Sequence, residues 1–294
     1  MRILMIGGTR FVGRHIVDAA IAAGHDVTVF HRGQTGPELF PQVERRTGDR
    51  NGDLSELAEG SWDATVDTCA YVPRQVHSLA DALGDRAGRY LLISSVSAYA
   101  TPESPGFTED AALLELDDPT TEEVTGETYG GLKVLCERAA VKRFGSGTVI
   151  VRPTYVVGPD DYTWRFPWWV QRLARGGEVL APGPADAPAQ LIDARDMATW
   201  AVGLLERGES GAYHAVSPPP PFSFADQAWY RKDLVIMPGD TITTTCTWDG
   251  FVNFGTDTSE EMCYLFTVAY PKGALSDGLP AGTAAHGGGA CLGL

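Results

Sequence analysis

The start of the chain constrains its fold more than any other stretch. An apolar run, Met1 to Ile6, leads directly into Gly7-Gly8-Thr9-Arg10-Phe11-Val12-Gly13, and a helix-forming stretch follows. A glycine-rich turn between a strand and a helix lets backbone N–H groups approach a pyrophosphate. A purely structural turn would use the same glycines, but the position at the start of a βαβ unit favours nucleotide binding. We expect cofactor contacts from Gly7, Thr9, Arg10, Phe11, Val12 and Gly13.

The N-terminal half alternates short apolar runs with helical stretches. Such alternation predicts a parallel sheet with crossover helices. Several runs are continuously apolar, which is typical of strands covered on both faces. The sequence therefore predicts an α/β fold with a doubly wound parallel sheet. Expected strands are Ile3–Ile6, Val27–Phe30, Ala64–Asp67, Tyr90–Ser94 and Thr148–Val151, and expected helices are Phe11–Ala23, Val76–Leu83, Thr128–Phe144 and Ala194–Glu206.

Composition argues against several classes of protein. The 294-residue chain has a formal net charge of -15 at pH 7, whereas binding to a nucleic-acid backbone relies on clustered Lys and Arg. No apolar stretch approaches the ~18 to 20 residues that span a bilayer, and Met1 to Ile6 lacks the flanks of a signal peptide. The five cysteines form no C-x-x-C pair. We expect a cytoplasmic protein with no metal site and no nucleic-acid or membrane partner.

The end of the second strand indicates which dinucleotide is bound. An NAD-selective site usually has Asp or Glu there for the ribose 2′-hydroxyl, but this chain has His31 and Arg32. Arg32, helped by Arg10, would neutralise a 2′-phosphate, although a solvated surface charge is the alternative. We therefore expect NADP in preference to NAD. Asp49 is placed to meet the adenine ring or only to form a turn, and Arg50 joins it in the expected cofactor set.

Three residues form a candidate catalytic group. Tyr129 and Lys133 are four residues apart in an expected helix, so both project from one face. An ammonium beside a phenol favours the phenolate and lowers its pKa, which would make Tyr129 a general acid or base. An exposed helical pair is the alternative interpretation. Ser95, at the end of an expected strand, would hold a substrate oxygen within reach of the tyrosine.

Residues 1 to about 214 resemble the extended short-chain dehydrogenase/reductase family, within its NAD-dependent epimerase/dehydratase group. The resemblance rests on the glycine turn, on Ser95, on Tyr129 with Lys133, and on the run Arg152 to Pro159. It implies a Rossmann-type fold and hydride transfer at a nicotinamide. Tyr129 would be the acid/base, Lys133 would bind the nicotinamide ribose, and Ser95 would orient the substrate.

The resemblance also extends to the walls of the cofactor site, with one departure. It implies that Pro153 lies against the nicotinamide and that Cys69 and Ala70 line the cofactor cleft. The middle glycine of the family's G-x-x-G-x-x-G is Arg10 here. This turn is similar to that of an atypical branch, which includes reductases and proteins that keep the fold without known catalysis.

The segments around this core are less informative. From Gly158 to His214 the pattern loosens into loops with one helix, which we assign to a small, partial substrate lobe over residues 158–216, following a dinucleotide-binding domain over 1–157. The acidic stretch from Glu103 to Glu127 is interpreted as a solvated loop rather than a lid. The cluster Trp164 to Trp169 either packs the lobe or forms a substrate wall with Arg165. Asp193 and its neighbours are interpreted as a helix cap with surface ion pairs.

The last quarter of the chain has a different character. After the proline run in Ser217 to Pro221, β-branched stretches at 241–247 and 264–270 predict an all-β segment, 217–294, with a fraying end. Residues 229–271 resemble the C-terminal end of copper type II, ascorbate-dependent monooxygenases. That resemblance implies copper ligation by Met262 and a Cys246–Cys263 disulfide. A copper site also needs imidazole ligands, and only His286 follows His214, so copper-dependent hydroxylation is the remote alternative.

These observations predict an NADP-dependent oxidoreductase or epimerase acting on a carbonyl, hydroxyl or sugar-nucleotide substrate. The alternative from another class is a nucleotide-binding or scaffold protein without turnover. Helices flanking the sheet could pair two subunits, so a homodimer and a monomer both stay open.

Overall fold

The computed structural model describes residues 1–101, 106–175, 188–216 and 222–223. The chain divides into two compact units. The first holds Met1–Tyr162 together with the described residues from Gln190 onward up to residue 216. The remaining described residues belong to the second, and each unit is taken by itself below.

The first unit is built on a seven-stranded sheet in which all neighbouring strands run parallel. The strand order is β10-β6-β5-β4-β1-β2-β3, so the winding direction reverses between β4 and β1. This arrangement confirms the predicted doubly wound, Rossmann-type sheet. The strands are β1 (Arg2–Ile6), β2 (Asp26–His31), β3 (Glu44–Thr47), β4 (Ala64–Asp67), β5 (Arg89–Ile93), β6 (Val149–Pro153) and β10 (Gly211–Ala215).

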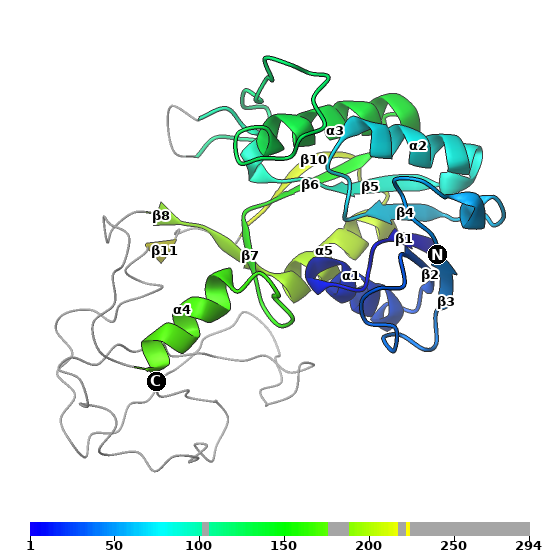
Figure 1. Cartoon of the computed structure of the whole chain (residues 1–294), viewed down its shortest axis with the longest axis horizontal. Helices are drawn as coiled ribbons and strands as arrows, with labels where there is room; N and C mark the ends of the chain where they lie inside the picture. Colours follow the sequence, from blue (N-terminus) through cyan, green and yellow to red (C-terminus); the bar gives the residue numbers. More distant parts are fainter. Residues whose placement is uncertain (102–105, 176–187, 217–221, 224–294) are drawn as a thin grey trace, which may run out of the picture. The chain divides into compact units, whose positions relative to one another are not determined.

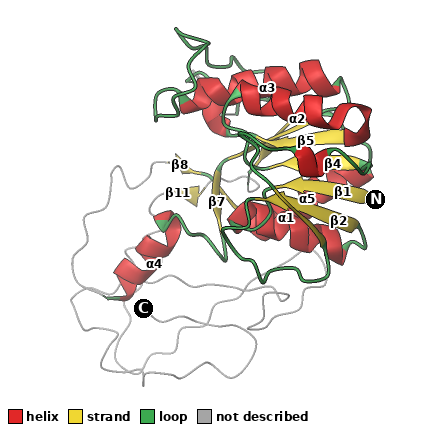
Figure 2. Ribbon diagram, turned by 45° about the vertical axis from the view of Figure 1, so that its right-hand side comes forward, coloured by secondary structure: helices red, strands yellow, loops and turns green. Residues whose placement is uncertain are grey.

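Four helices cover the two faces of the sheet. Helices α1 (Phe11–Ala22) and α5 (Ala194–Glu206) lie on one face, and α2 (Pro73–Leu83) and α3 (Tyr129–Phe144) lie on the other (Figures 1 and 2). Asp193 caps α5, because its side chain accepts a hydrogen bond from Arg195 N at 2.8 Å and its carboxylate pairs with the same arginine. The predicted cap and surface ion pair at this helix are therefore confirmed.

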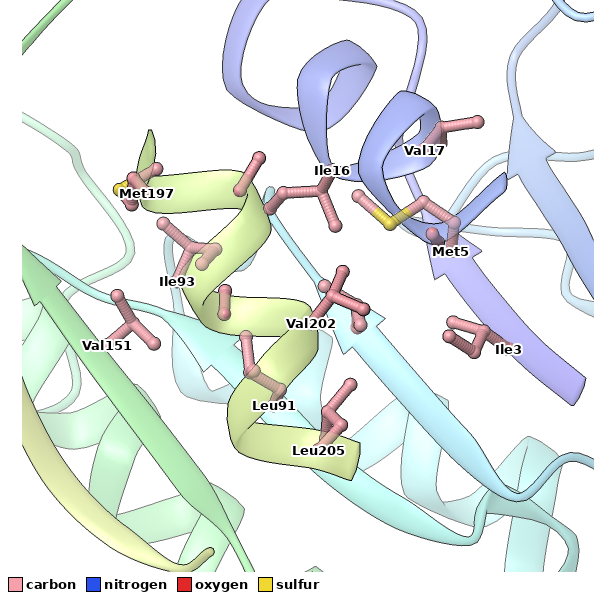
Figure 3. Close-up of a cluster of buried hydrophobic side chains, with 14 of the residues drawn as sticks. Ile3, Met5, Ile16, Val17, Leu91, Ile93, Val151, Met197, Val202 and Leu205 are labelled. Carbon is pink, nitrogen blue, oxygen red and sulfur yellow. The ribbon is translucent and has the colours of Figure 1, made fainter. Parts of the chain in front are cut away.

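The core lies in two layers, one on each face. Successive residues of a strand point to opposite faces, and in β1 this sends Ile3 and Met5 to one layer and Leu4 and Ile6 to the other. Figure 3 shows the first layer, in which side chains from β1 meet Ile16 of α1 and others from α5. Because both faces are covered, β1 is apolar at consecutive positions, as the sequence predicted.

Several elements correct the expectation of loops between Gly158 and His214. Helix α4 (Arg165–Ala174) forms where only Trp-rich loop was expected, and it takes Pro167 within its first turn, where a missing N–H costs no hydrogen bond. Strand β7 (Tyr155–Val157) pairs in parallel with β9 (Leu191–Asp193). Strand β10 joins the main sheet beside β6. Helix α5 and β10, expected in a separate lobe, thus belong to the same compact unit as the glycine turn.

Short elements complete the described chain. These are the 3-10 helices η1 (Ser55–Leu57), η2 (Gly84–Ala87) and η3 (Val96–Ala98), and, in the second unit, α4 and the antiparallel pair β8 (Pro188–Ala189) and β11 (Phe222–Ser223). The expected strands at 241–247 and 264–270, Met262 and the Cys246–Cys263 disulfide lie outside the described residues. Among the helices that are described, none is long and apolar enough to cross a membrane.

Candidate active site

Parallel strands end at one edge of the sheet, and this edge carries the predicted site residues. In doubly wound sheets, ligands bind outside the carboxyl ends of the strands where the winding reverses, which here is between β4 and β1. The residues at or just after the carboxyl ends of these strands therefore lie at this edge. They are the glycine turn, His31 and Arg32, Cys69 and Ala70, Ser95, and Pro153. Segments far apart in the sequence are thus brought to one edge.

The glycine turn has the backbone geometry of an anion site. Gly7 and Gly8 have φ of 99° and 91°, which favour glycine. A Cβ on Gly13 would lie 2.8 Å from Gly8 N, so glycine is needed for α1 to pack against the turn. Helix α1 has neither an acidic residue in its first turn nor a side-chain cap. Its first N–H groups are therefore suited to a pyrophosphate.

Arg10 replaces the family glycine without backbone strain. It is the N-cap of α1, with an extended φ of -135° and ψ of 138°. The positive φ falls instead on Phe11, at 35°, whose side chain is buried in the core layer. The Arg10 guanidinium carbon lies 4.8 Å from the centroid of the Tyr162 ring. Thr9 contacts the loop after β2 through Thr35, with 2.8 Å between their hydroxyl oxygens.

The end of β2 presents one exposed cation and no carboxylate. His31 is buried, and its Nδ1 accepts a hydrogen bond from Gly33 N at 3.1 Å. Burial, and then the charge of Arg45, lower the pKa of His31 and favour the neutral ring. Arg32 is exposed. Asp49, predicted at the adenine, is also exposed and forms a turn in which its carboxylate accepts from Asn51 N at 2.9 Å.

Arg50 lies below the surface of the site. Its guanidinium makes two hydrogen bonds with the buried Asp67 carboxylate, at 2.6 and 2.9 Å. Asp67 also accepts from Cys69 N at 3.0 Å and from the Tyr90 hydroxyl at 2.7 Å. Arg50 therefore positions the Cys69–Ala70 segment through Asp67. Burial, and then Asp67, raise the pKa of the Cys69 thiol, so it stays protonated.

The Lys133 ammonium is held at the carboxyl ends of two neighbouring strands. It is 3% exposed and donates to the carbonyl oxygens of Ala70 at 2.8 Å and of Ile93 at 2.7 Å. Burial lowers its pKa. The Tyr71 ring contacts both members of the predicted pair, with its centroid 5.6 Å from Lys133 Nζ and 6.4 Å from the Tyr129 ring. Tyr129 and Lys133 are therefore not an exposed surface pair.

The segments that carry Ser95 and Tyr129 pack closely against each other. Tyr129 begins α3, and a Cβ on the next residue, Gly130, would lie 2.0 Å from the carbonyl oxygen of Ser97. Glycine is therefore required where α3 meets η3. Ser95 is the N-cap of η3, and its Oγ accepts from Ser97 N at 3.1 Å. Its O–H proton remains available as a donor.

A buried polar network, not predicted from the sequence, lies beneath Ser95. The Arg152 guanidinium donates to Glu137 of α3 at 2.7 and 3.0 Å, and Ser94 Oγ donates to the same carboxylate at 2.5 Å. Arg152 also donates to the Tyr99 hydroxyl at 2.6 Å, and His214 Nε2 lies 2.6 Å from that oxygen. These contacts tie β5, β6, β10 and η3 to α3 around Ser95. Pro153, beside Arg152, pairs with Ala215 of β10.

Part of the acidic stretch between Glu103 and Glu127 makes contacts with α2 and β10, whereas two tryptophans of the cluster Trp164 to Trp169 are half-exposed. Glu122 forms a bidentate ion pair with Arg74 at the start of α2, and Glu109 accepts from His214 N at 2.9 Å, so parts of the acidic stretch are anchored. Trp164 and Trp168 are 54% and 47% exposed within the second unit. The substrate wall stays a prediction. Within the described residues, no group of three His, Cys, Asp or Glu side chains could hold a metal ion.

Sequence comparison identifies the family. The pattern of the NAD dependent epimerase/dehydratase family matches residues 3–72 and 60–216, well over half of the chain. The chain belongs to this family. Its similarity to solved epimerase/dehydratase folds agrees: a UDP-glucuronic acid 4-epimerase from Bacillus cereus, in complex with NAD, superposes with a TM-score of 0.62 at 20% identity, covering 77% of this chain and 81% of that one.

Two curated relatives carry different names. The 2'-dehydrokanamycin reductase of Streptomyces kanamyceticus is 31% identical over 229 residues, which cover 72% of this chain and 56% of that protein. The chloroplast stem-loop binding protein of 41 kDa b of Arabidopsis thaliana is 26% identical over 220 residues, covering 69% of this chain and 55% of that protein. The epimerase/dehydratase chain thus spans about half the length of the curated relatives it matches.

Proposed function

We propose that this chain is an NADP-dependent oxidoreductase or epimerase that acts on a carbonyl, hydroxyl or sugar-nucleotide substrate. The observation that carries the proposal is the buried Lys133 ammonium, which is held by two strand-end carbonyls one helical turn after Tyr129. An ammonium is costly to bury, so its place at this edge of the sheet is better explained by function than by stability. Membership of the family, and relatives named as reductase and epimerase, support the same proposal.

Each residue has a defined task in this reaction. A bound nicotinamide would supply or accept the hydride. Tyr129 Oη would give a proton to the substrate oxygen during reduction, or take it during oxidation, while Lys133 binds the nicotinamide ribose and stabilises the phenolate. Ser95 Oγ would donate a hydrogen bond to the same substrate oxygen. The close contact of α3 with η3 at Gly130 supports the pairing of Ser95 with Tyr129.

The preference for NADP rests on Arg32. It is exposed at the end of β2, next to a buried His31 whose lowered pKa keeps it uncharged, where an NAD-selective site would present a carboxylate. Fluorescence titration should show tighter binding of NADPH than of NADH. In Arg32→Ala, the Kd for NADPH should rise about tenfold, because a charge-assisted contact is lost, and the Kd for NADH should not change. An equal effect on both dinucleotides would contradict the assignment.

Tyr129→Phe separates an enzyme from a nucleotide-binding protein without turnover. Wild-type protein is screened against carbonyl compounds and sugar nucleotides by NADPH absorbance and by product analysis. With a substrate in hand, Tyr129→Phe should reduce kcat at least about 100-fold, because the proton donor is lost, and should leave the Kd for NADPH unchanged. If the variant turns over like wild type, Tyr129 is not the acid/base. NADPH binding without turnover of any substrate class would favour the scaffold alternative.

A further inference from the structure

The segment after β7 lies along the first turns of α1, next to the glycine turn. Three contacts join them. His15 Nε2 donates to the carbonyl oxygen of Pro159 at 2.9 Å, Arg14 pairs with Asp160 at 2.7 Å, and the Arg10 guanidinium lies over the Tyr162 ring at 4.8 Å. All of these residues belong to the first compact unit. The side chain that replaces the family glycine therefore has a fixed neighbour.

Arg10 and Arg32 occupy different positions in the βαβ unit. Arg10 is the N-cap of α1, whereas Arg32 directly follows β2. In a dinucleotide-binding βαβ unit the diphosphate lies at the N-terminus of the first helix, and the residue that follows the second strand meets the ribose. Arg10 therefore lies at the diphosphate end of this arrangement.

We infer that Arg10 is a ligand of the cofactor's diphosphate, not of its 2′-phosphate, and that Tyr162 positions the Arg10 guanidinium for this contact. The inference rests on the proposed function, since it requires a dinucleotide at the glycine turn. Arg10 is the N-cap of α1, whose uncapped first turn faces the diphosphate position. The guanidinium carbon lies over the Tyr162 ring, and the five N–H donors of an arginine point outwards in the guanidinium plane, where they can donate to phosphate oxygens. Arg10 then adds a charge where the family glycine adds none.

Matched arginine variants test the assignment by binding alone. Fluorescence titrations with NADPH and with NADH should show that Arg10→Ala raises both Kd values by a similar factor of about ten or more, because the diphosphate is common to both. Arg32→Ala should affect NADPH only. Arg2→Ala removes an exposed arginine at the opposite end of β1 and should change neither Kd. An Arg10→Ala effect confined to NADPH, or no effect, would overturn the inference.

Tyrosine variants test the positioning role. Tyr162→Leu should raise both Kd values about three- to fivefold, and Tyr162→Phe, which keeps the ring, should stay within about twofold of wild type. In an Arg10→Ala background, Tyr162→Leu should add nothing, because the pair acts through one guanidinium; additive losses would show that Tyr162 does not act through Arg10. Thermal unfolding of every variant checks that the fold is retained. If wild-type protein binds neither dinucleotide, the proposed function fails together with this inference. Wild-type binding that Arg10→Ala leaves unchanged rejects the inference alone.

Discussion

Gly130 and Gly131 follow Tyr129 directly and leave room for two neighbouring segments. A Cβ on Gly130 would lie 2.0 Å from the Ser97 carbonyl oxygen, and a Cβ on Gly131 would lie 2.5 Å from the Leu116 side chain. The first clash involves backbone of η3, which cannot rotate away as a side chain can. The start of α3 can therefore approach the Ser95 segment this closely only because residue 130 has no side chain.

Gly130→Ala should destabilise the protein by about 1–3 kcal/mol, because the overpacking exceeds the helix propensity that alanine gains. The measurement is the free energy of unfolding in urea. Gly147→Ala is the matched control, since a Cβ there meets nothing within 4 Å. If the two variants were equally stable, α3 and η3 would not be in the contact described.

The loop after β4 is held from beneath by charges rather than by apolar packing alone. Burial by itself would raise the pKa of the Asp67 carboxyl, but Arg50, Tyr90 and the N–H of Cys69 together hold it below its ordinary value. The loop supplies the Ala70 carbonyl that accepts from Lys133 and the backbone of Tyr71, whose N–H donates to Gln75 Oε1 at 2.7 Å. The Arg50–Asp67 pair thus connects the turn after β3 with the candidate catalytic residues.

Asp67→Asn should cost about 3–5 kcal/mol of stability at pH 7, because it leaves Arg50 buried without its counter-charge. The folded-state pKa of Asp67 lies below its unfolded value, so its contribution is complete above about pH 4 and is lost as the pH falls through the folded-state pKa. The stability difference from wild type should therefore shrink towards pH 2. Urea unfolding at pH 7, 4 and 2.5 measures it, and a difference independent of pH would contradict the assigned ion pair.

The net negative charge of the whole chain affects its binding to other negatively charged molecules. A net charge of -15 disfavours general binding to a phosphate backbone, whereas one relative is named for binding stem-loops. A dinucleotide needs only a local positive site. Arg10 follows β1 through the glycine turn and Arg32 follows the adjacent strand β2, and under the proposed function these two arginines would provide that site.

We expect no specific binding of a stem-loop RNA at physiological ionic strength, in a preparation that binds NADPH. Fluorescence anisotropy with a labelled RNA hairpin over a range of salt concentrations measures this. Saturable binding that weakens steeply with added salt would show a cationic surface that the total charge conceals, and would contradict the expectation that the chain has no nucleic-acid partner.

The sequence by itself determined the elements whose pattern is local. The β1 strand, the glycine turn and α1 are contiguous, and β1 is apolar at consecutive positions from Ile3 to Ile6, so these elements are recognisable without knowledge of their neighbours. That Tyr129 and Lys133 lie one turn apart in a single helix was also predictable, because four residues make about one helical turn. No residue range was predicted for the edge strands β3 and β10, because an edge strand such as Glu44–Thr47 lacks a continuous apolar run.

Only the tertiary structure decided which distant side chains share a site. Arg50 looked like a cofactor residue beside Asp49, but it pairs with Asp67 across strands. The Glu137–Arg152 ion pair and the cation–π contact of Arg10 with Tyr162 likewise join residues from different parts of the chain. A buried charge is stable only beside its partner, and the partner is found by folding, not by proximity in sequence. Periodicity therefore predicts the layers of this molecule, while contacts between layers assign the roles of its charged residues.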